Sequence, residues 1–345
     1  MRTGSGTTQT TLIGIAVVIV AGIAAIAAFL LMDADRPLAP LGPEYNYDLS
    51  EYAVIDPDLI LYEQIGQTFP TGLAQSRVIT VGPDNTLWVA GDKQIVQFSS
   101  DGRRLGTIDC PAEPIAIAPD ADGLLYAGLI DHIAVYDTNG AVIAQWQRPH
   151  EQALLTSLAL QGGYIFAADA GSRSVWRYST EGQVVAQFGQ RDADRNHPGF
   201  VIPSPYGFNL AAAPDGLLRI VNSGRHLVEA WTIDGHREWW WGRPFIGIEG
   251  FSGCCNPAAL AVLPNGHYIT SEKGLVRIKE YDPQGELIGV VAGPEQLEII
   301  GSMRVYERPQ DAQVRGFGVA ADADGRVYVL DIFRNVVRVF EKKEL

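Results

Sequence analysis

Short apolar runs alternate with tight-turn sequences from about residue 77 to the C-terminus, and the pattern occurs six times. Each copy has an apolar run, a Pro-Asp-Gly-like turn, a second run, a short polar break, a third run and an Asp-Gly-like turn. Such turns join antiparallel strands because Gly and Asn adopt positive φ at low cost. A period of roughly 40 residues with about four strands per copy is typical of a β-propeller. The pattern therefore predicts an all-β, six-bladed β-propeller.

The ring needs a strand from outside the repeats to close. Five copies are followed by a fourth strand, whereas the sixth ends shortly after Phe340. An open ring would leave unpaired strand edges. The segment 59–65 (LILYEQI), followed by Gly-Gln, matches the strand 183–188, which is also followed by Gly-Gln. We therefore expect residues 59–65 to pair with 336–340 as the outer strand of the last blade, within a propeller of residues 59–345.

The repeats resemble those of the NHL family. The last copy shows this best, with VAADADG from Val319, VYVLD from Val327 and VVRVF from Val336. The resemblance covers nearly everything after Ser76 and implies an NHL-type propeller. It implies little about chemistry, because NHL propellers include both binding modules and enzymes.

An uncharged apolar stretch, residues 11–32, precedes the repeats. At 1.5 Å per residue in a helix, it is long enough to span a hydrocarbon core of about 30 Å. A cleaved signal peptide is the alternative, although its apolar region usually has about 7–15 residues. We expect an N-terminal transmembrane signal-anchor helix, with residues 1–10 in the cytoplasm.

The flanks of this stretch predict the orientation. Arg2 precedes it, whereas Asp33 and Asp35 follow it, which favours a propeller outside the cytoplasm. Residues 33–58 are expected to form a tether, extended where they are proline-rich. The sequence thus predicts a single-pass protein of the cytoplasmic (inner) membrane, with the propeller on the periplasmic or extracytoplasmic side.

The charge balance limits the partners. The chain has 40 acidic and 26 basic residues, for a net charge of −14, and no basic patch. This argues against a nucleic-acid partner. Besides the membrane, we expect a protein partner in an extracytoplasmic complex and allow for a small anionic ligand. No cofactor is predicted.

Three long blade-to-blade links are expected to share one face of the ring. Links alternate between the faces of a four-stranded meander, so residues 190–206, 242–257 and 292–315 should lie together with the links between strands two and three. Long loops on a rigid scaffold commonly carry binding sites. Capping of the channel is the alternative.

The run 251–257 (FSGCCNP) in the second long link is the most unusual in the chain. Together with LPNG and TSEKG further on, it resembles a block in uncharacterised, membrane-anchored bacterial NHL-repeat proteins. The alternation of links predicts that Cys254, Cys255 and Asn256 lie near Glu272 and Lys273 at one mouth of the ring.

Adjacent cysteines form a disulfide with difficulty. Consecutive Cα atoms are about 3.8 Å apart across a trans peptide, whereas relaxed disulfides prefer about 4.4–6.8 Å. For Cys254 and Cys255 a vicinal disulfide, two free packed thiols and a redox or metal centre remain alternatives. A metal centre lacks a second spaced Cys or His pair, so no metal site is predicted. Cys110 is expected to stay single.

Several charged residues are candidates for ligand binding. Glu272 and Lys273 suit acid/base chemistry or ion pairs with loop arginines. The arginines of the long links would suit a carboxylate or phosphate if they converged, and ordinary exposed arginines are the alternative. These arginines are Arg191, Arg243, Arg304 and Arg308. His132 and His226 are expected at the same mouth, where zinc-binding NHL lyases use His, and we interpret both as rim residues.

These patterns favour a binding or assembly module. The first alternative is a lyase-like or hydrolase-like enzyme with a pocket at the mouth of the long links. The second is a thiol redox sensor that works through Cys254 and Cys255.

Overall fold

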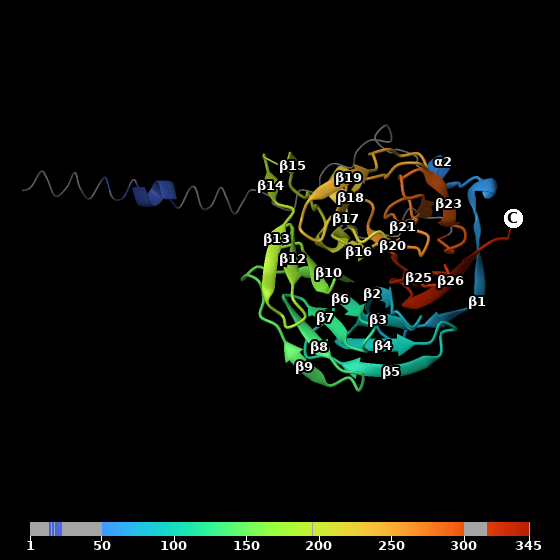
Figure 1. The fold of residues 1–345 in the computed structure, drawn as a ribbon. Coiled ribbons are helices and arrows are strands. Elements are labelled where there is room, and N and C mark those ends of the chain that lie inside the picture. The colour runs from blue at the N-terminus through green and yellow to red at the C-terminus, as the bar shows by residue number, and fades with distance from the viewer. Residues whose placement is uncertain are drawn as a thin grey trace, which may run out of the picture. The chain divides into compact units, whose positions relative to one another are not determined.

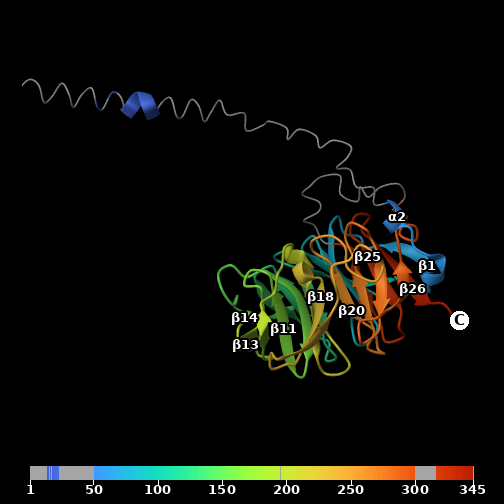
Figure 2. The ribbon, with the colours of Figure 1, turned by 90° about the horizontal axis from the view of Figure 1, so that it is seen from above.

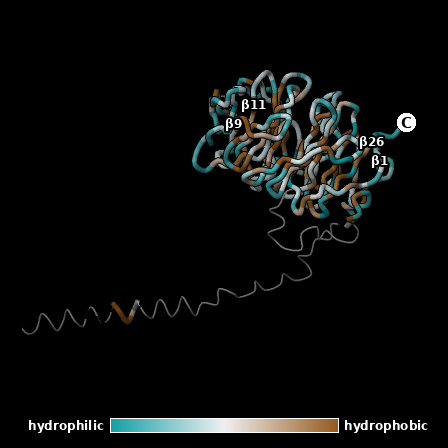
Figure 3. The backbone as a smooth tube through the Cα atoms, turned by 90° about the horizontal axis from the view of Figure 1, so that it is seen from below, coloured by the Kyte–Doolittle hydropathy of each residue, from teal (hydrophilic) through white to brown (hydrophobic). Residues whose placement is uncertain are grey.

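The computed structural model describes residues 14, 16, 18–22, 50–194, 196–299 and 316–344. The chain divides into two compact units, 1–48 and 49–345, and the second is the propeller (Figure 1). The described residues between 14 and 22 are helical, and this short helix is hydrophobic (Figure 3). No helix in the described part of the chain is both long and apolar enough to cross a membrane. Most of the expected span 11–32, the segment 1–10 and most of the tether lie outside the described residues.

Six four-stranded antiparallel sheets form the propeller. Blade one contains β2 (Ser76–Val81), β3 (Leu87–Gly91), β4 (Gln94–Phe98) and β5 (Arg104–Asp109). Blade two contains β6 (Ala116–Pro119), β7 (Leu125–Leu129), β8 (His132–Tyr136) and β9 (Val142–Gln145). Blade three contains β10 (Leu155–Gln161), β11 (Tyr164–Asp169), β12 (Ser174–Tyr178) and β13 (Val184–Phe188).

Blade four contains β16 (Leu210–Ala212), β17 (Leu218–Asn222), β18 (Leu227–Trp231) and β19 (Arg237–Trp241). Blade five contains β20 (Ala259–Val262), β21 (Tyr268–Ser271), β22 (Ile278–Tyr281) and β23 (Leu287–Ala292). Blade six contains β24 (Gly318–Ala321), β25 (Val327–Asp331), β26 (Val336–Lys342) and β1 (Tyr62–Pro70). The innermost strands β2, β6, β10, β16, β20 and β24 contact one another in this order, and β24 contacts β2. The predicted all-β, six-bladed propeller is confirmed.

The remaining elements are short. They are α2 (Ser50–Ala53), η2 (Pro57–Leu59), η3 (Pro205–Gly207), η4 (Ser223–Arg225) and the two-stranded sheet of β14 (Arg191–Asp192) and β15 (His197–Pro198). The ring and its depth are seen in Figures 1 and 2.

The N-terminal strand β1 completes the last blade by pairing antiparallel with β26. The pairing begins at Tyr62 rather than at Leu59, and β1 extends to Pro70. Leu59 instead ends η2, a turn that begins at Pro57. The next residues contact blade five, where the Leu61 N–H donates to the Val290 carbonyl (3.0 Å).

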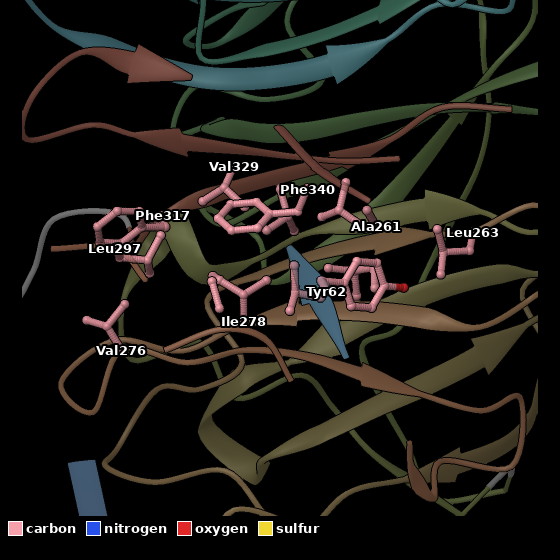
Figure 4. Packing of buried hydrophobic residues seen from close by; sticks show 14 residues of the cluster. Tyr62, Ala261, Leu263, Val276, Ile278, Leu297, Phe317, Val329 and Phe340 are labelled. Atoms are coloured by element: carbon pink, nitrogen blue, oxygen red, sulfur yellow. The ribbon is translucent and has the colours of Figure 1, made fainter. Parts of the chain in front are cut away.

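A buried carboxylate joins both ends of the propeller chain to blade five. Glu280 on β22 accepts from the Tyr62 hydroxyl (3.1 Å) and from Lys342 Nζ (2.7 Å). Tyr62 and Phe340 belong to the core cluster between blades five and six (Figure 4). β1 is therefore part of the core.

The Asp-Gly turns have a second role in packing neighbouring blades. Gly285, at φ +87°, lies against the indole of Trp241 at the end of the preceding blade's outer strand, and a Cβ on Gly285 would lie 2.4 Å from Trp241 Cγ. Gly182 and Trp146 repeat this contact two blades earlier. Glycine is thus required at these turns for two reasons: it adopts the positive φ, and it leaves room for the side chain of the preceding blade.

Candidate functional site

The described parts of the three long links meet the links between strands two and three on one face of the ring, called here the long-link face, while the hairpin of β14 and β15 in the first link extends to the perimeter (Figure 1). Each link contacts the link between strands two and three of the blade that follows it. The contacts are Val201 N to Asn222 Oδ1 (2.9 Å), Ser252 N to Glu272 Oε2 (2.9 Å) and Arg334 Nη1 to the Leu297 carbonyl (3.4 Å). The opposite face carries the Pro-Asp-Gly and Asp-Gly turns and is called the turn face.

Glu272 occupies a repeated structural position at the end of strand two. Asp169 accepts from the Leu154 N–H (2.8 Å) in blade three, just as Glu272 accepts from Ser252 in blade five. Asp92 accepts from the Gln75 N–H (3.0 Å) in blade one. The residue at this position therefore fastens the incoming link to its blade.

The Glu272 carboxylate also lies in a buried ion cluster. Arg277 donates Nε to Oε1 (3.0 Å) and Nη2 to Oε2 (2.9 Å), and Lys279 Nζ lies 2.7 Å from Oε1. All three side chains are at most 1% exposed. Glu272 thus forms ion pairs, but with Arg277 and Lys279 of its own blade rather than with loop arginines. Sequence reasoning missed both cations, although charges within an otherwise apolar third strand were a signal.

The cluster holds the second long link in place. Arg277 Nη1 donates to the Ile246 carbonyl (3.1 Å), and Lys279 Nζ donates to the carbonyls of Ile248 (2.9 Å) and Gly250 (2.6 Å). Burial, aided by the charge of Arg277 and opposed by Glu272, lowers the pKa of Lys279 to about 8. The link is therefore a fixed part of the blade.

The Asn256 side chain joins the cysteine run to the Lys273 backbone. Its Oδ1 accepts from the Lys273 N–H (2.8 Å), while Nδ2 donates to the carbonyls of Lys273 (2.9 Å) and Ser252 (2.7 Å). This brings Cys254, Cys255 and Asn256 together with Lys273, which is 6% exposed. The Asn256 amide is fully used in holding the backbone.

The two adjacent thiols differ in accessibility. Cys254 and Cys255 are unbonded, with their sulfurs 3.7 Å apart; Cys254 is exposed and Cys255 is buried. Partial burial and the neighbouring Cys255 thiol raise the pKa of Cys254 despite Lys273, and burial raises the pKa of Cys110. The vicinal disulfide stays a prediction for an oxidising compartment.

Alkylation of the reduced, folded protein by iodoacetamide is expected to modify Cys254 first and Cys110 last. The thiolate is the reacting form, so the raised pKa of Cys254 predicts slow reaction at neutral pH and acceleration above the ordinary thiol pKa. Peptide mapping over time measures the order. After treatment with oxidised glutathione, Cys254 and Cys255 should resist alkylation as a pair. A bridge from Cys110 to either would contradict the blade assignment, since Cys110 lies in the core cluster of blades one and two.

Arg191 and Arg243 lie one blade apart. Arg191 follows β13, whose last residue Phe188 packs against Gly235 of blade four. Arg243 follows β19, whose last residue Trp241 packs against Gly285 of blade five. The structure therefore does not bring Arg191 to the cysteine run.

The Arg243 side chain is 60% exposed; its guanidinium pairs with Glu249 and lies over the Phe245 ring (5.1 Å). Arg304 and Arg308 lie outside the described residues.

Histidines at the long-link face are separated. His226 Nε2 lies 2.6 Å from the Gly253 carbonyl, whereas His132 pairs with Asp131 (2.7 Å) in blade two. Within the described ranges, no group of three or more His, Cys, Asp or Glu side chains is placed to hold a metal ion.

Blade three brings together a serine, an aspartate and a histidine, but the aspartate lies between the other two. These residues are Ser172, Asp169 and His150. Asp169 Oδ2 binds both Ser172 Oγ (2.5 Å) and His150 Nε2 (2.5 Å), while His150 Nδ1 accepts from the Gln152 N–H (3.2 Å). A hydrolytic triad requires His between Ser and Asp. The cluster therefore fastens a link.

A cavity of about 870 Å³ follows the axis of the ring and is lined mainly by the innermost strands. None of the candidate residues that the structure describes lines it. The axial cavity is therefore not the pocket that we expected Cys254, Glu272 and Lys273 to form at the mouth.

No protein-family model matches the sequence, and no curated protein matches it. Solved structures do resemble the fold. They include a streptogramin B lyase, at 12% identity and TM-score 0.54, covering 82% of this chain and 98% of that one. A catalytically inactive variant of virginiamycin B lyase from Staphylococcus aureus with quinupristin has 12% identity and TM-score 0.53, covering 80% and 83%. A protein of unknown function from Bacteroides thetaiotaomicron has 15% identity and TM-score 0.57, covering 81% and 73%. At these identities, the likeness shows the propeller fold alone.

Proposed function

We propose that the protein is a membrane-anchored, extracytoplasmic binding or assembly module of the NHL type, which docks a protein partner on its long-link face. One observation carries this proposal: the uneven distribution of exposed large hydrophobic side chains between the two faces.

Within the described residues, links of the long-link face carry four such residues, and others lie on the outer strands of the blades. The four in the links are Ile130 (42% exposed), Val201 (40%), Phe245 (46%) and Phe333 (40%). No exposed large hydrophobic residue lies in a described turn of the turn face. Exposed apolar side chains in the loops of a rigid scaffold commonly contribute to interaction sites. The proposal therefore assigns docking to the long-link face.

The fixed conformation of residues 242–257 supports the same proposal. The Ile246, Ile248 and Gly250 carbonyls are held by buried cations, so Phe245 is presented by an ordered backbone. A preorganised surface loses less conformational entropy when a partner binds.

The enzyme alternative is less favoured, because the Glu272 carboxylate, one of its proposed acid/base groups, is buried and paired with Arg277 and Lys279. The likeness to lyases supports it at the level of the fold alone. One observation favours the redox alternative: the sulfurs of Cys254 and Cys255 are 3.7 Å apart.

The anchoring part of the proposal rests on the uncharged stretch 11–32. N-terminal sequencing of the mature protein from native membranes is expected to find this stretch retained, and alkaline carbonate should not release the protein. A mature N-terminus beyond Met32 would contradict the anchor while leaving the docking proposal open.

Single aspartate substitutions at Phe245 or Val201 are expected to weaken partner retention during purification from native membranes by about tenfold or more, because each places a charge in an apolar contact. Quantitative mass spectrometry of co-purified membrane proteins measures the change. Val184→Asp on β13, where the side chain is 49% exposed, is the matched control and should retain the partner. Equal loss from all three variants would contradict docking at this face.

A further inference from the structure

A second cavity lies at the perimeter of the ring, between the outer strands of blades three and four. Its volume of about 640 Å³ is within the range of small-molecule sites. The buried rings of Phe188 and Trp231 line it, together with the polar side chains of Gln187, Arg191 and Arg237. It shares no lining residue with the axial cavity.

The hairpin of β14 and β15 forms one wall of this cavity and is the one two-stranded sheet in the described part of the chain. Figure 1 shows it at the perimeter of the ring, beyond β13. Two contacts fix it to blade four: His197 Nε2 lies 3.3 Å from the buried Glu229 Oε2, and Arg237 Nη2 donates to the Asn196 carbonyl (3.1 Å). The wall that carries Arg191 is therefore held in place without a ligand.

The cavity has an excess of basic side chains, although the whole chain has a net charge of −14. Arg191, Arg237 and the His236 imidazole line it, against a single carboxylate, that of Asp192. Neither guanidinium forms an ion pair with a carboxylate among the described residues, and Arg237 is oriented by stacking over Trp240 (4.2 Å). Such unpaired arginines beside a preformed cavity provide countercharge for an anion.

We propose that this cavity binds a small organic dianion, a dicarboxylate or a phosphate monoester. Arg191 and Arg237 would each donate to the anionic groups through the planar guanidinium fork, which matches both carboxylate and phosphate geometry. Gln187 Nε2 donates to Ser174 Oγ (2.8 Å) and has one further N–H for a ligand, while Phe188 and Trp231 supply the apolar part of the lining. This proposal does not require protein docking at the long-link face, although Arg191 belongs to the same long link as Val201.

Isothermal titration of the full-length protein in neutral detergent tests the proposal, with succinate and glycerol 3-phosphate as probes and succinamide and glycerol as uncharged controls. One of the dianions should bind saturably with a Kd below about 1 mM, and its identity distinguishes the two chemistries. Arg191→Gln and Arg237→Gln should each weaken that binding about 10- to 100-fold, the effect of losing a charged hydrogen bond. Arg243→Gln, an exposed arginine one blade further on, should leave it unchanged.

Absence of saturable binding below about 1 mM for both dianions would overturn the proposal, as would equally tight binding of an uncharged analogue. An equal loss in Arg243→Gln would do the same. Arg237 also holds the hairpin, so the melting temperature of each variant is compared with that of the wild type. If Arg237→Gln is destabilised, the Arg191→Gln result is used instead, because the Arg191 side chain is exposed and forms no ion pair with a described residue. Retention of the membrane partner by these variants separates this test from the docking proposal.

Discussion

Replacing Glu272 by glutamine is expected to lower the free energy of unfolding by about 3–5 kcal/mol, the usual cost of removing one partner from a buried ion cluster. The carboxylate is the countercharge for both Arg277 and Lys279, which are buried with it. Without its charge, two cations remain in the interior, and glutamine offers one acceptor oxygen where Glu272 uses two for Ser252, Arg277 and Lys279. Chemical denaturation followed by tryptophan fluorescence measures the change.

Glu249→Gln is the matched control in the same region of the molecule. Glu249 pairs with Arg243 at the surface, where both side chains are 60% exposed, so its loss should cost less than about 1 kcal/mol. Similar effects of the two substitutions would contradict the structural role of the Glu272 cluster.

The Glu272 effect should also depend on pH. Glu272 raises the pKa of Lys279, so its removal lowers that pKa below about 8. As the pH rises toward 8, Lys279 deprotonates first in the folded variant, while the unfolded lysine keeps its proton, so the variant gains stability before the wild type does. The difference in free energy of unfolding between the wild type and Glu272→Gln should therefore become smaller as the pH approaches 8. Chemical denaturation at several pH values measures this difference.

Deleting residues 1–70 is expected to make the propeller aggregate or unfold, whereas deleting 1–48 should leave it soluble. The longer deletion removes β1, exposes the edge of β26 and takes Tyr62 from the core and from Glu280. The loss of a buried strand should exceed about 5 kcal/mol, which corresponds to a fall in Tm of roughly 10 °C or more. Equal solubility and melting of the two deletions would refute the closing role of β1.

Much of the fold could be predicted from the sequence because it depends on local signals. Turn glycines such as Gly285 and the apolar runs between them mark each strand, and the missing sixth outer strand indicates that an N-terminal segment closes the ring. The exact start of β1 could not be predicted, because a helical turn at Pro57 and a contact with Val290 determine it.

The candidate site was less predictable because its partners are distant in sequence. Alternation of links correctly predicted that Asn256 and Lys273 meet. Glu272 occupies the position at the end of strand two that fastens the incoming link in other blades. This shared role is seen only when the blades are superposed. Arg191 and Arg243 are in equivalent links, but a one-blade rotation separates them. No periodicity in the sequence predicts the cavity beneath β14 and β15.

Site-specific photo-crosslinking in native membranes determines whether a protein docks at the long-link face. A photoreactive amino acid is placed at Phe245 or Val201 on that face, and at Asn265 or Asp122, exposed residues of the turn face. We predict that both long-link positions crosslink to the same membrane-associated protein, while the turn-face positions do not. Crosslinking from the turn face alone, or no protein adduct from either long-link position, would contradict this prediction.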